Sequence, residues 1–325
     1  MENNKFTIGV ICMTFNHAPY IEDAMNGFCM QETTFPYVCM IIDDASTDNE
    51  PEIIKNYLKS YFDLDDKLIV RNEVTDDYYL IFAQHKINRN CFFAVIFLKY
   101  NHYSIKKTKM TYLKEWNDNV KYRAICEGDD YWIDKNKLQK QVDFLENHPE
   151  HSLCIHAYRR DIYKDNEVIS MDIHKYPTNM EIIPDRDVIN GTGMFGATAS
   201  MVYRKSSTQD YPDWAKRAPV SDRPLKFVLF ARGHIAYLDT VMSVYRVGVP
   251  GSWTKRVNGN RKEEKKTRAR FVQLLVDFDE WTDQKYHKFV YCAIREYKYT
   301  CLKKDIISIL YIPYKFMRQF WGINK

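Results

Sequence analysis

The chain has 325 residues, a formal net charge of +4, 45% hydrophobic residues and 15% aromatic residues. This length allows one large domain or one core with a sizeable appendage, and the composition excludes a fibrous or largely disordered protein. No stretch approaches the roughly 18 apolar residues that a membrane-spanning helix needs.

Charge is distributed unevenly along the chain. Residues 255–325 carry 17 Lys and Arg against 8 Asp and Glu, a net of +9, whereas residues 1–254 carry −5. The last part of this basic segment, Ile306–Trp321, mixes aliphatic and aromatic residues with Lys315 and Arg318 and follows Lys303 and Lys304. This pattern fits an interfacial helix on an anionic membrane surface, and it equally fits a C-terminal helix that packs on the protein body.

Eight cysteines show neither a Cys-x-x-Cys pair nor even spacing. Cys12, Cys39 and Cys126 lie inside apolar runs, where a thiol behaves as a small hydrophobe. Met1–Lys5 also lacks the basic start and apolar core of a signal peptide. We therefore expect reduced cysteines and a cytoplasmic protein, peripheral at the inner face of the membrane if the basic segment binds lipid.

Two strand-to-helix junctions open the chain. Thr7–Thr14 predicts a strand that ends at Phe15-Asn16-His17, before a helix that begins near Pro19. Val38–Ile42 is a continuous apolar run, which is typical of a strand buried on both faces of a parallel sheet. Asp43 and Asp44 follow it, and Thr47–Glu50 with Pro51 predicts a capping box at the start of the next helix.

A third junction is more acidic. The apolar run Ala124–Cys126 stops at Glu127-Gly128-Asp129-Asp130, ahead of a helix near Asp134. Carboxylates this close repel one another unless a cation or hydrogen-bond donors compensate them, and hard oxygen ligands suit Mg²⁺ or Mn²⁺. Taken alone, the turn also fits a simple helix cap. Three such junctions together predict a nucleotide-binding α/β domain, because open α/β sheets bind ligands at the carboxyl ends of their strands.

The rest of the chain alternates less regularly. Lys67–Arg71 predicts a strand, and residues 76–122 predict an insertion with apolar segments at 78–83 and 91–100 and a polar helical part at 101–122. Further predicted elements are helices over Lys137–Leu145 and from Asp222 to Gly233, strands at Ser152–Tyr158, Ala197–Arg204 and Ile235–Leu238, a tight loop at Gly191–Gly196, and helices after Arg261.

Five segments in this order and spacing resemble the family 2 glycosyltransferases of GT-A fold, of the bacterial cell-envelope or capsular polysaccharide type. They are Ile8–Asn16, Ile41–Asp48, Glu127–Trp132, Asp222–Leu225 and Val241–Arg246. The resemblance implies an α/β GT-A domain over residues 1–254, with a mixed central sheet flanked by helices, and leaves 255–325 as a helical C-terminal extension. It implies an inverting transfer of a sugar from a nucleotide-diphosphate donor, UDP-linked by preference, to a hydroxyl of a saccharide or lipid-linked saccharide.

The resemblance also implies roles for individual residues. Asp222 falls at the position of the catalytic base, although Asp before Pro224 is also a common helix N-cap. Asp130, with Asp129, falls at the site of Mn²⁺ or Mg²⁺. The residues implied for the nucleotide-sugar are Thr14, Phe15, Asn16, Asp43, Asp44, Asp129 and Arg246. A family histidine after Tyr245-Arg246 is replaced here by Gly248, which leaves Arg246, Lys255 or Arg256 to supply positive charge.

Other function classes fit less well. A nucleotidyltransferase also uses paired carboxylates, but Met13–His17 has no glycine- and arginine-rich triphosphate loop. A catalytically silent carbohydrate- or nucleotide-binding relative predicts loss of a metal aspartate or of the base, and all are present. No G-x-G-x-x-G follows the first strand, which disfavours a dinucleotide oxidoreductase. Nucleic acid is not expected as a partner, because the basic residues lie outside the predicted site.

Overall fold

The computed structural model describes residues 6–165, 167–176, 179–190, 196–250 and 260–297. The chain divides into two compact units, and each is described by itself. The first comprises residues 1–183, 193–211 and 228–259, and the second comprises residues 184–192, 212–227 and 260–325. The domain boundary predicted near residue 254 falls in 251–259, outside the described residues.

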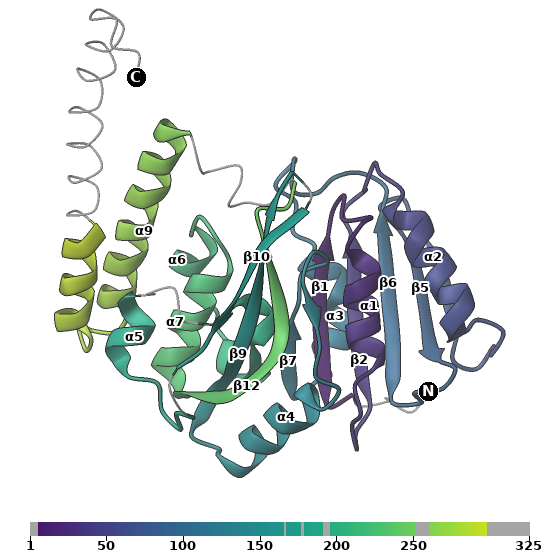
Figure 1. Cartoon of the computed structure of the whole chain (residues 1–325), viewed down its shortest axis with the longest axis horizontal. Coiled ribbons are helices and arrows are strands. Elements are labelled where there is room, and N and C mark those ends of the chain that lie inside the picture. The colour runs from purple at the N-terminus through teal and green to yellow at the C-terminus, as the bar shows by residue number, and fades with distance from the viewer. Residues whose placement is uncertain (1–5, 166, 177–178, 191–195, 251–259, 298–325) are drawn as a thin grey trace, which may run out of the picture. The chain divides into compact units, whose positions relative to one another are not determined.

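One mixed sheet organises the first unit (Figure 1). Along the sheet the strands follow the order β3-β5-β6-β2-β1-β7-β11-β9-β12-β8, while β4 pairs with β5 and β10 pairs with β9. The strands are β1 (Ile8–Thr14), β2 (Tyr37–Asp43), β3 (Phe62–Asp63), β4 (Arg71–Val74), β5 (Tyr78–His85), β6 (Cys91–Leu98), β7 (Tyr122–Ile125), β8 (Tyr131–Trp132), β9 (His151–Lys164), β10 (Glu167–His174), β11 (Val202–Arg204) and β12 (His234–Val247).

The four strands β6, β2, β1 and β7 run parallel to one another and form the part of the sheet that positions the site. In register, Thr14 of β1 lies beside Asp43 of β2, which lies beside Phe97 of β6. Every residue of β2 is buried, as its continuous apolar sequence predicts for a strand covered on both faces. Because parallel strands point the same way, their carboxyl ends meet at one edge of the sheet.

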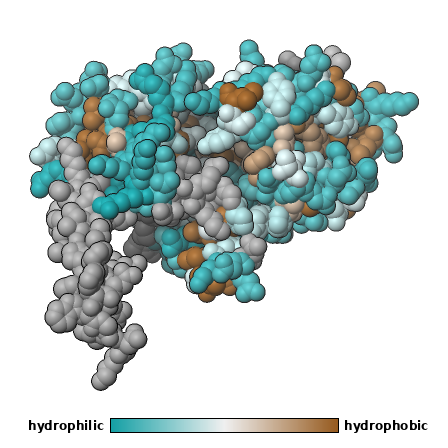
Figure 2. Space-filling model, turned by 90° about the horizontal axis from the view of Figure 1, so that it is seen from above, coloured by the Kyte–Doolittle hydropathy of each residue, from teal (hydrophilic) through white to brown (hydrophobic). Residues whose placement is uncertain are grey.

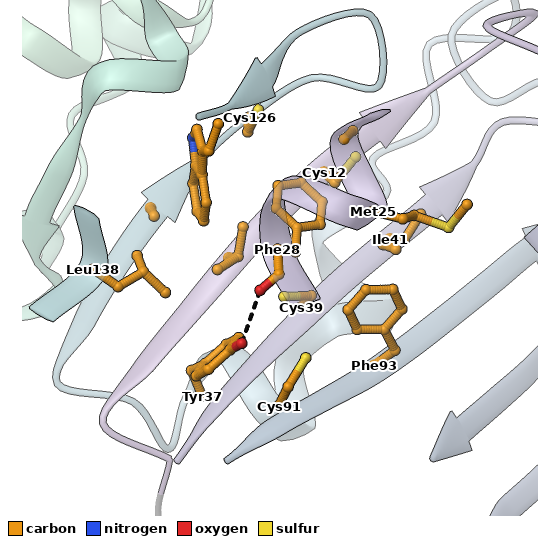
Figure 3. Close-up of a cluster of buried hydrophobic side chains, with 14 of the residues drawn as sticks. Cys12, Met25, Phe28, Tyr37, Cys39, Ile41, Cys91, Phe93, Cys126 and Leu138 are labelled. Atoms are coloured by element: carbon orange, nitrogen blue, oxygen red, sulfur yellow. Dashed lines mark hydrogen bonds between the residues drawn. The ribbon is translucent and has the colours of Figure 1, made fainter. Parts of the chain in front are cut away.

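Helices cover both faces of these strands. One face packs against α1 (Ile21–Cys29), α2 (Glu50–Tyr61) and α4 (Lys137–Asn147), and the other packs against η1 (Met110–Leu113) and α3 (Lys114–Asn117). Figure 3 shows the first of these cores, where Phe28 of α1 and Phe93 of β6 lie over the sheet among Cys39 and Cys91. Alternate residues of β2 enter opposite cores, since a strand's side chains alternate between its faces.

The segment 76–122 contributes two strands to the main sheet. β6 pairs parallel with β2, and β5 pairs antiparallel with β6. The prediction of a strand at Lys67–Arg71 is wrong, because residues 67–69 form a turn and β4 begins only at Arg71. Of the helix expected across 101–122, only the short helices η1 and α3 form. Residues 99–109 instead form turns, from which Asn101 and His102 donate hydrogen bonds to Asp44, just after β2.

The elements after the acidic turn follow the prediction more closely. Helix α4 buries Leu138, Val142 and Leu145, the predicted apolar stripe, and ends before His148. The strand expected at Ser152–Tyr158 lies within the longer β9, which pairs antiparallel with β10 and parallel with β12. Of the strand expected at Ala197–Arg204 only β11 forms, since residues Thr198–Ser200 adopt the short 3-10 helix η2.

Helices make up the second unit. They are α5 (Asp185–Asn190), α6 (Asp213–Lys216), the first turns of α7 (Asp222–Arg232), α9 (Arg261–Trp281) and a helix over residues 287–297. Their core is aromatic: the Phe278 ring centroid lies 4.7 Å from that of Phe227 and 6.2 Å from that of Trp214. The segment Ile306–Trp321 lies outside the described residues, as do most of the glycines of Gly191–Gly196.

The seven cysteines within the described residues are free thiols, as the sequence predicts. Across the same residues, no helix combines the length and apolar character that a bilayer span requires. Figure 2 shows that hydrophilic residues cover most of the coloured surface seen from above, with hydrophobic residues in small separate patches.

Candidate functional site

The loops that follow β1 and β2 are bonded to each other at the carboxyl edge of the sheet. The Asn16 backbone N donates to Ser46 Oγ at 2.9 Å, and the Thr47 backbone N donates to Asn16 Oδ1 at 2.8 Å. Asn16 and Ala45 both take left-handed backbone angles, with φ of 57° and 60°. These contacts hold Phe15 at the surface, where the residue is 41% exposed and its ring is available to stack on a flat ligand.

Glu50 is the buried centre of this pair of loops. Its carboxylate accepts hydrogen bonds from Thr14 Oγ1, from the His17 backbone N at 2.8 Å and from Ser46 Oγ at 2.8 Å. The predicted capping box is therefore wrong: helix α2 begins at Glu50 with Asn49 before it, and the Glu50 side chain turns away to bind the β1 loop. Sequence reasoning saw the Glu50 position only as a helix cap and missed this role.

The two carboxylates after β2 have different surroundings. Asp43 Oδ1 accepts from the Ser46 backbone N at 3.1 Å, and burial raises the pKa of Asp43 to about 6. The Asp44 carboxylate accepts from the backbone N atoms of His102 and Tyr103 at 2.7 and 3.1 Å, and pairs with Lys109 Nζ at 2.6 Å. Asp44 therefore fastens the segment after β6 to the end of β2.

The acidic turn after β7 packs directly against the end of β1. The Gly128 backbone N donates to the Met13 carbonyl at 3.1 Å. A Cβ atom on Gly128 would lie only 2.7 Å from Thr14 Cβ and 3.1 Å from His17 Nδ1, so this close approach requires glycine. His17 Nε2 in turn lies 3.9 Å from Asp129 Oδ2. The structure thus brings the predicted residues of the first and third junctions together.

Asp130 is the most buried carboxylate of the turn. Its Oδ1 accepts from the Arg246 backbone N at 2.9 Å. Burial, with the nearby Asp129 and Glu127 carboxylates, raises the pKa of Asp130 well above its ordinary value. A cation at this turn would relieve the same repulsion.

Arg246 supports the acidic turn from strand β12. Its guanidinium donates to the Asp129 carbonyl at 2.9 Å, pairs with Asp23 of α1 and lies 4.3 Å from the centre of the Tyr131 ring. The side chain is buried. The resemblance assigns the Arg246 guanidinium to nucleotide-sugar binding. In the structure these protein contacts occupy the guanidinium, and Arg246 thereby stabilises the acidic turn.

The residues of the turn fit a divalent cation. Mg²⁺ and Mn²⁺ accept one or two protein carboxylates and take further oxygens from substrate phosphates and water. Asp129 and Asp130 provide such carboxylates, and burial, followed by the neighbouring carboxylates, raises the pKa of Asp130. Within the described residues, no group of three or more His, Cys, Asp or Glu side chains is placed to hold a metal ion by itself.

Asp222 lies in the second unit. It is the first residue of α7, as predicted, and Lys226 Nζ lies 3.3 Å from its Oδ2 one turn later. Of the other predicted sources of positive charge, Lys255 and Arg256 lie outside the described residues.

Comparison with known sequences relates the first part of the chain to a family. Residues 9–77, which include β1, β2 and both carboxylates after β2, match the sequence model described as glycosyl transferase family 2. Over these residues the chain is similar to that family. Two uncharacterized proteins, Rv1520 of Mycobacterium tuberculosis strain H37Rv and Mb1547 of Mycobacterium bovis, are each 30% identical to this chain over 262 residues. The aligned region is 78% of this chain and 63% of each relative, so the chain spans less than two thirds of their length.

The TarS structure supports the GT-A fold of this chain. Staphylococcus aureus TarS 1–349 in complex with UDP-GlcNAc has a TM-score of 0.50 and 14% identity, over 83% of this chain and 66% of that chain. The mannosyltransferase PcManGT of Pyrobaculum calidifontis, in complex with GDP-Man and Mn²⁺, has a TM-score of 0.49 and 10% identity, over 96% and 81% of the two chains. At these identities the TarS likeness concerns the fold and not the substrate.

Two contacts of the site were not predicted. Glu50 and Lys109 both bind predicted residues, yet neither stood out in the sequence. Lys109 lies 65 positions after Asp44, in a segment that carries other lysines, and no local pattern distinguishes it. The only signal for Glu50 was an acidic residue at a helix start, which ordinarily indicates a cap.

Proposed function

We propose that this protein transfers a sugar from a nucleoside-diphosphate donor to an acceptor hydroxyl, by a single inverting displacement. The observation that carries the proposal is the convergence of three loops at the carboxyl edge of β2, β1 and β7. An exposed aromatic ring (Phe15), a polar network around Glu50 and a desolvated acidic turn (Asp129 and Asp130) lie together there. The exposed ring suits a base and the acidic turn suits a metal-bound diphosphate, while the network around Glu50 holds the loops that carry Phe15 and Asp43.

Asp129 and Asp130 would hold Mn²⁺ or Mg²⁺ together with the diphosphate. A cation bound there offsets the negative charge that grows on the leaving diphosphate. Arg246, through its backbone N and its guanidinium, keeps the acidic turn in place.

Asp222 is the proposed base. A carboxylate in ionised form takes the proton of the acceptor hydroxyl while its oxygen attacks the anomeric carbon. Lys226 Nζ lies 3.3 Å from Asp222 Oδ2. The donor is proposed to be a UDP-sugar, and the acceptor a saccharide or lipid-linked saccharide of a cell-surface polysaccharide. We further propose that the basic segment 255–325 holds the protein at an anionic membrane surface.

Calorimetric titration of the full chain tests the first step. UDP, GDP and dTDP are each titrated with Mn²⁺ and again with EDTA. We expect UDP to bind in the presence of Mn²⁺ and this binding to be lost in EDTA. Binding of another nucleotide in its place would change the donor and keep the reaction class. Absence of binding by all three would leave the silent relative as the better description.

A further inference from the structure

Strand β10 lies beside β9 at an edge of the sheet (Figure 1). Among the residues that the structure describes, β9 is the strand that pairs with β10, and Glu167–Ile173 make no backbone hydrogen bond outside that pair. The free side of β10 therefore presents N–H and C=O groups to which a further strand can bond. Glu167–His174 contains no Lys, Arg or Pro, the residues that commonly protect an edge strand from such pairing.

One face of β10 is apolar and exposed. Its apolar residues, which are between 39% and 61% exposed, are Val168, Ile169, Met171 and Ile173. Met171 and Ile173 share a face because side chains two residues apart in a strand point the same way. The register with β9 shifts between Val168 and Ser170, which is a β-bulge, and the extra residue brings both Val168 and Ile169 to that same face.

The apolar face is complementary to a second copy of itself. In an antiparallel β10–β10 pair with its two-fold axis at Met171, this residue faces Met171 of the second copy. Ile169 then faces Ile173 of the second copy, and Ile173 faces Ile169. Apolar side chains that meet directly across two strands stabilise the pair, and a two-fold axis repeats each contact.

The polar face selects this register. With the axis at Met171, Asp172 lies opposite Ser170 of the second copy, and Glu167, across the bulge, lies opposite His174. An axis one residue later would set Asp172 against its own copy, and an axis at Ser170 would set Asp172 against Glu167. Like charges directly opposite each other destabilise a strand pair, so the register centred on Met171 is favoured by charge.

We propose that β10 joins two copies of this protein, whose sheets continue into one another through an antiparallel β10–β10 pair. A lipid bilayer fits this edge less well, because hydrocarbon offers no partners for the N–H and C=O groups. The eight residues of β10 are fewer than the roughly 20–30 residues a side of a standard interface, so the dissociation constant is expected to be on the order of micromolar. The inference does not depend on the proposed function.

The contact has a consequence for the acidic turn. Met171 of β10 lies opposite Asp161 of β9, which lies opposite Arg246 of β12, so the three side chains share one face of the sheet. In the dimer β12 and its copy are five strand spacings apart, or about 24 Å. A two-fold axis perpendicular to the sheet keeps this face on the same side in both copies. The two acidic turns, which Arg246 contacts, then lie on one side of the dimer.

Sedimentation velocity of the full chain, from about 1 to 100 µM, tests for the dimer across the expected range of dissociation constants. Met171→Glu is expected to raise the dissociation constant about tenfold or more, because two carboxylates would meet at the axis. Ile87→Glu is the matched control, since Ile87 is an exposed apolar residue in the turn between β5 and β6. Circular dichroism checks the fold of both variants.

Disulfide cross-linking tests the register. Facing residues of an antiparallel pair have Cα atoms about 4.5–5.5 Å apart, within the reach of a disulfide, so Met171→Cys is expected to give a covalent dimer when diamide is added as the oxidant. Ile173→Cys is the control, because its two copies would lie four residues apart along the strands, or about 14 Å. Both are made with Cys292→Ser and Cys301→Ser to remove other sites of cross-linking.

Three results would overturn the inference. The first is a protein that stays monomeric at every concentration, which would leave the apolar face for a different partner. The second is a dimer that Met171→Glu weakens no more than Ile87→Glu does, which would place the contact elsewhere on the protein. The third is cross-linking of Ile173→Cys as strong as that of Met171→Cys.

Discussion

The ammonium of Lys137 lies 4.1 Å from the centre of the Trp132 ring, with both side chains buried beneath the sheet. The same Nζ donates to Gln141 Oε1 at 2.8 Å, and Gln141 Nε2 donates to the carbonyls of Cys154 and Ser200. Burial lowers the pKa of Lys137 to about 7. A buried lysine of α4 thus contacts β8 directly and β9 and η2 through Gln141. The sequence predicted Lys137 only as part of a helix.

This lysine predicts a specific pH dependence of stability. Between about pH 7, where folded Lys137 loses its proton, and its ordinary pKa of 10.5, the unfolded chain binds one more proton than the folded chain. The free energy of unfolding therefore rises with pH across this window, by at most about 1.4 kcal/mol per pH unit, and the cost is fully present below pH 7. Urea unfolding from pH 6 to 10 measures this slope.

Lys137→Met is expected to flatten that slope. Lys140→Met is the control, because Lys140 lies on the same helix with a 42% exposed side chain paired to Asp134. If Lys137→Met and the wild-type protein have the same slope, Lys137 does not titrate in this range.

Gly128→Ala is expected to damage both stability and donor binding. The added Cβ meets Thr14 Cβ at 2.7 Å, so the acidic turn must move away from β1, at a cost of about 1–3 kcal/mol. Thermal unfolding and UDP titration measure the two effects. Gly9→Ala is the control at the opposite end of β1, where the new Cβ meets the flexible end of Met40 at 2.7 Å and otherwise makes ordinary contacts with Val120 from 3.4 Å. Equal effects of the two variants on UDP affinity would contradict the packing described here.

Glu50→Ala is expected to destabilise the protein by about 1–3 kcal/mol, because it leaves Thr14, Ser46 and the His17 backbone N without their acceptor. It should also weaken nucleotide binding, since the loops after β1 and β2 lose their common anchor. Glu50→Gln keeps an acceptor oxygen and should recover part of both losses. Stability by urea unfolding and affinity by calorimetry are compared for the two variants; a fully stable Glu50→Ala protein would show that these hydrogen bonds do not anchor the two loops.

Asp130→Asn and Asp222→Asn separate metal binding from base catalysis. Both variants are expected to fold and to lose transfer activity by about 10² or more. Asp130→Asn should also lose the Mn²⁺-dependent part of UDP binding, whereas Asp222→Asn should bind UDP as the wild-type protein does. Turnover is followed by release of UDP from the donor. Near-normal turnover by either variant would remove the role assigned to that residue.

Membrane attachment is tested on the basic segment. Replacing Lys303, Lys304, Lys315 and Arg318 with Gln in the full chain is expected to weaken sedimentation with anionic liposomes, since each basic residue near such a surface contributes about 1 kcal/mol. Neutral liposomes are the control. If the variant sediments with anionic liposomes as strongly as the wild-type protein, the segment has another role, such as packing or contact between copies.

The sequence by itself determined the elements that depend on neighbouring residues. The continuous apolar run at Val38–Ile42 predicted a doubly covered strand, and the spacing of Leu138, Val142 and Leu145 predicted one buried helix face. The carboxylates at the ends of β2 and β7 followed from the same local patterns, because a strand end and its turn lie within a few residues of each other.

Only the tertiary structure decided which partners those carboxylates have. Lys109 reaches Asp44 because β6 pairs with β2, and Arg246 reaches Asp130 because β12 runs close to the acidic turn. Glu50 bonds to the β1 loop instead of capping its own helix, since the packing of β1 beside β2 brings Thr14 Oγ1 and the His17 backbone N to it. These contacts join residues that are between 33 and 116 positions apart in the sequence. They depend on the order of the strands in the sheet, which no local sequence pattern encodes.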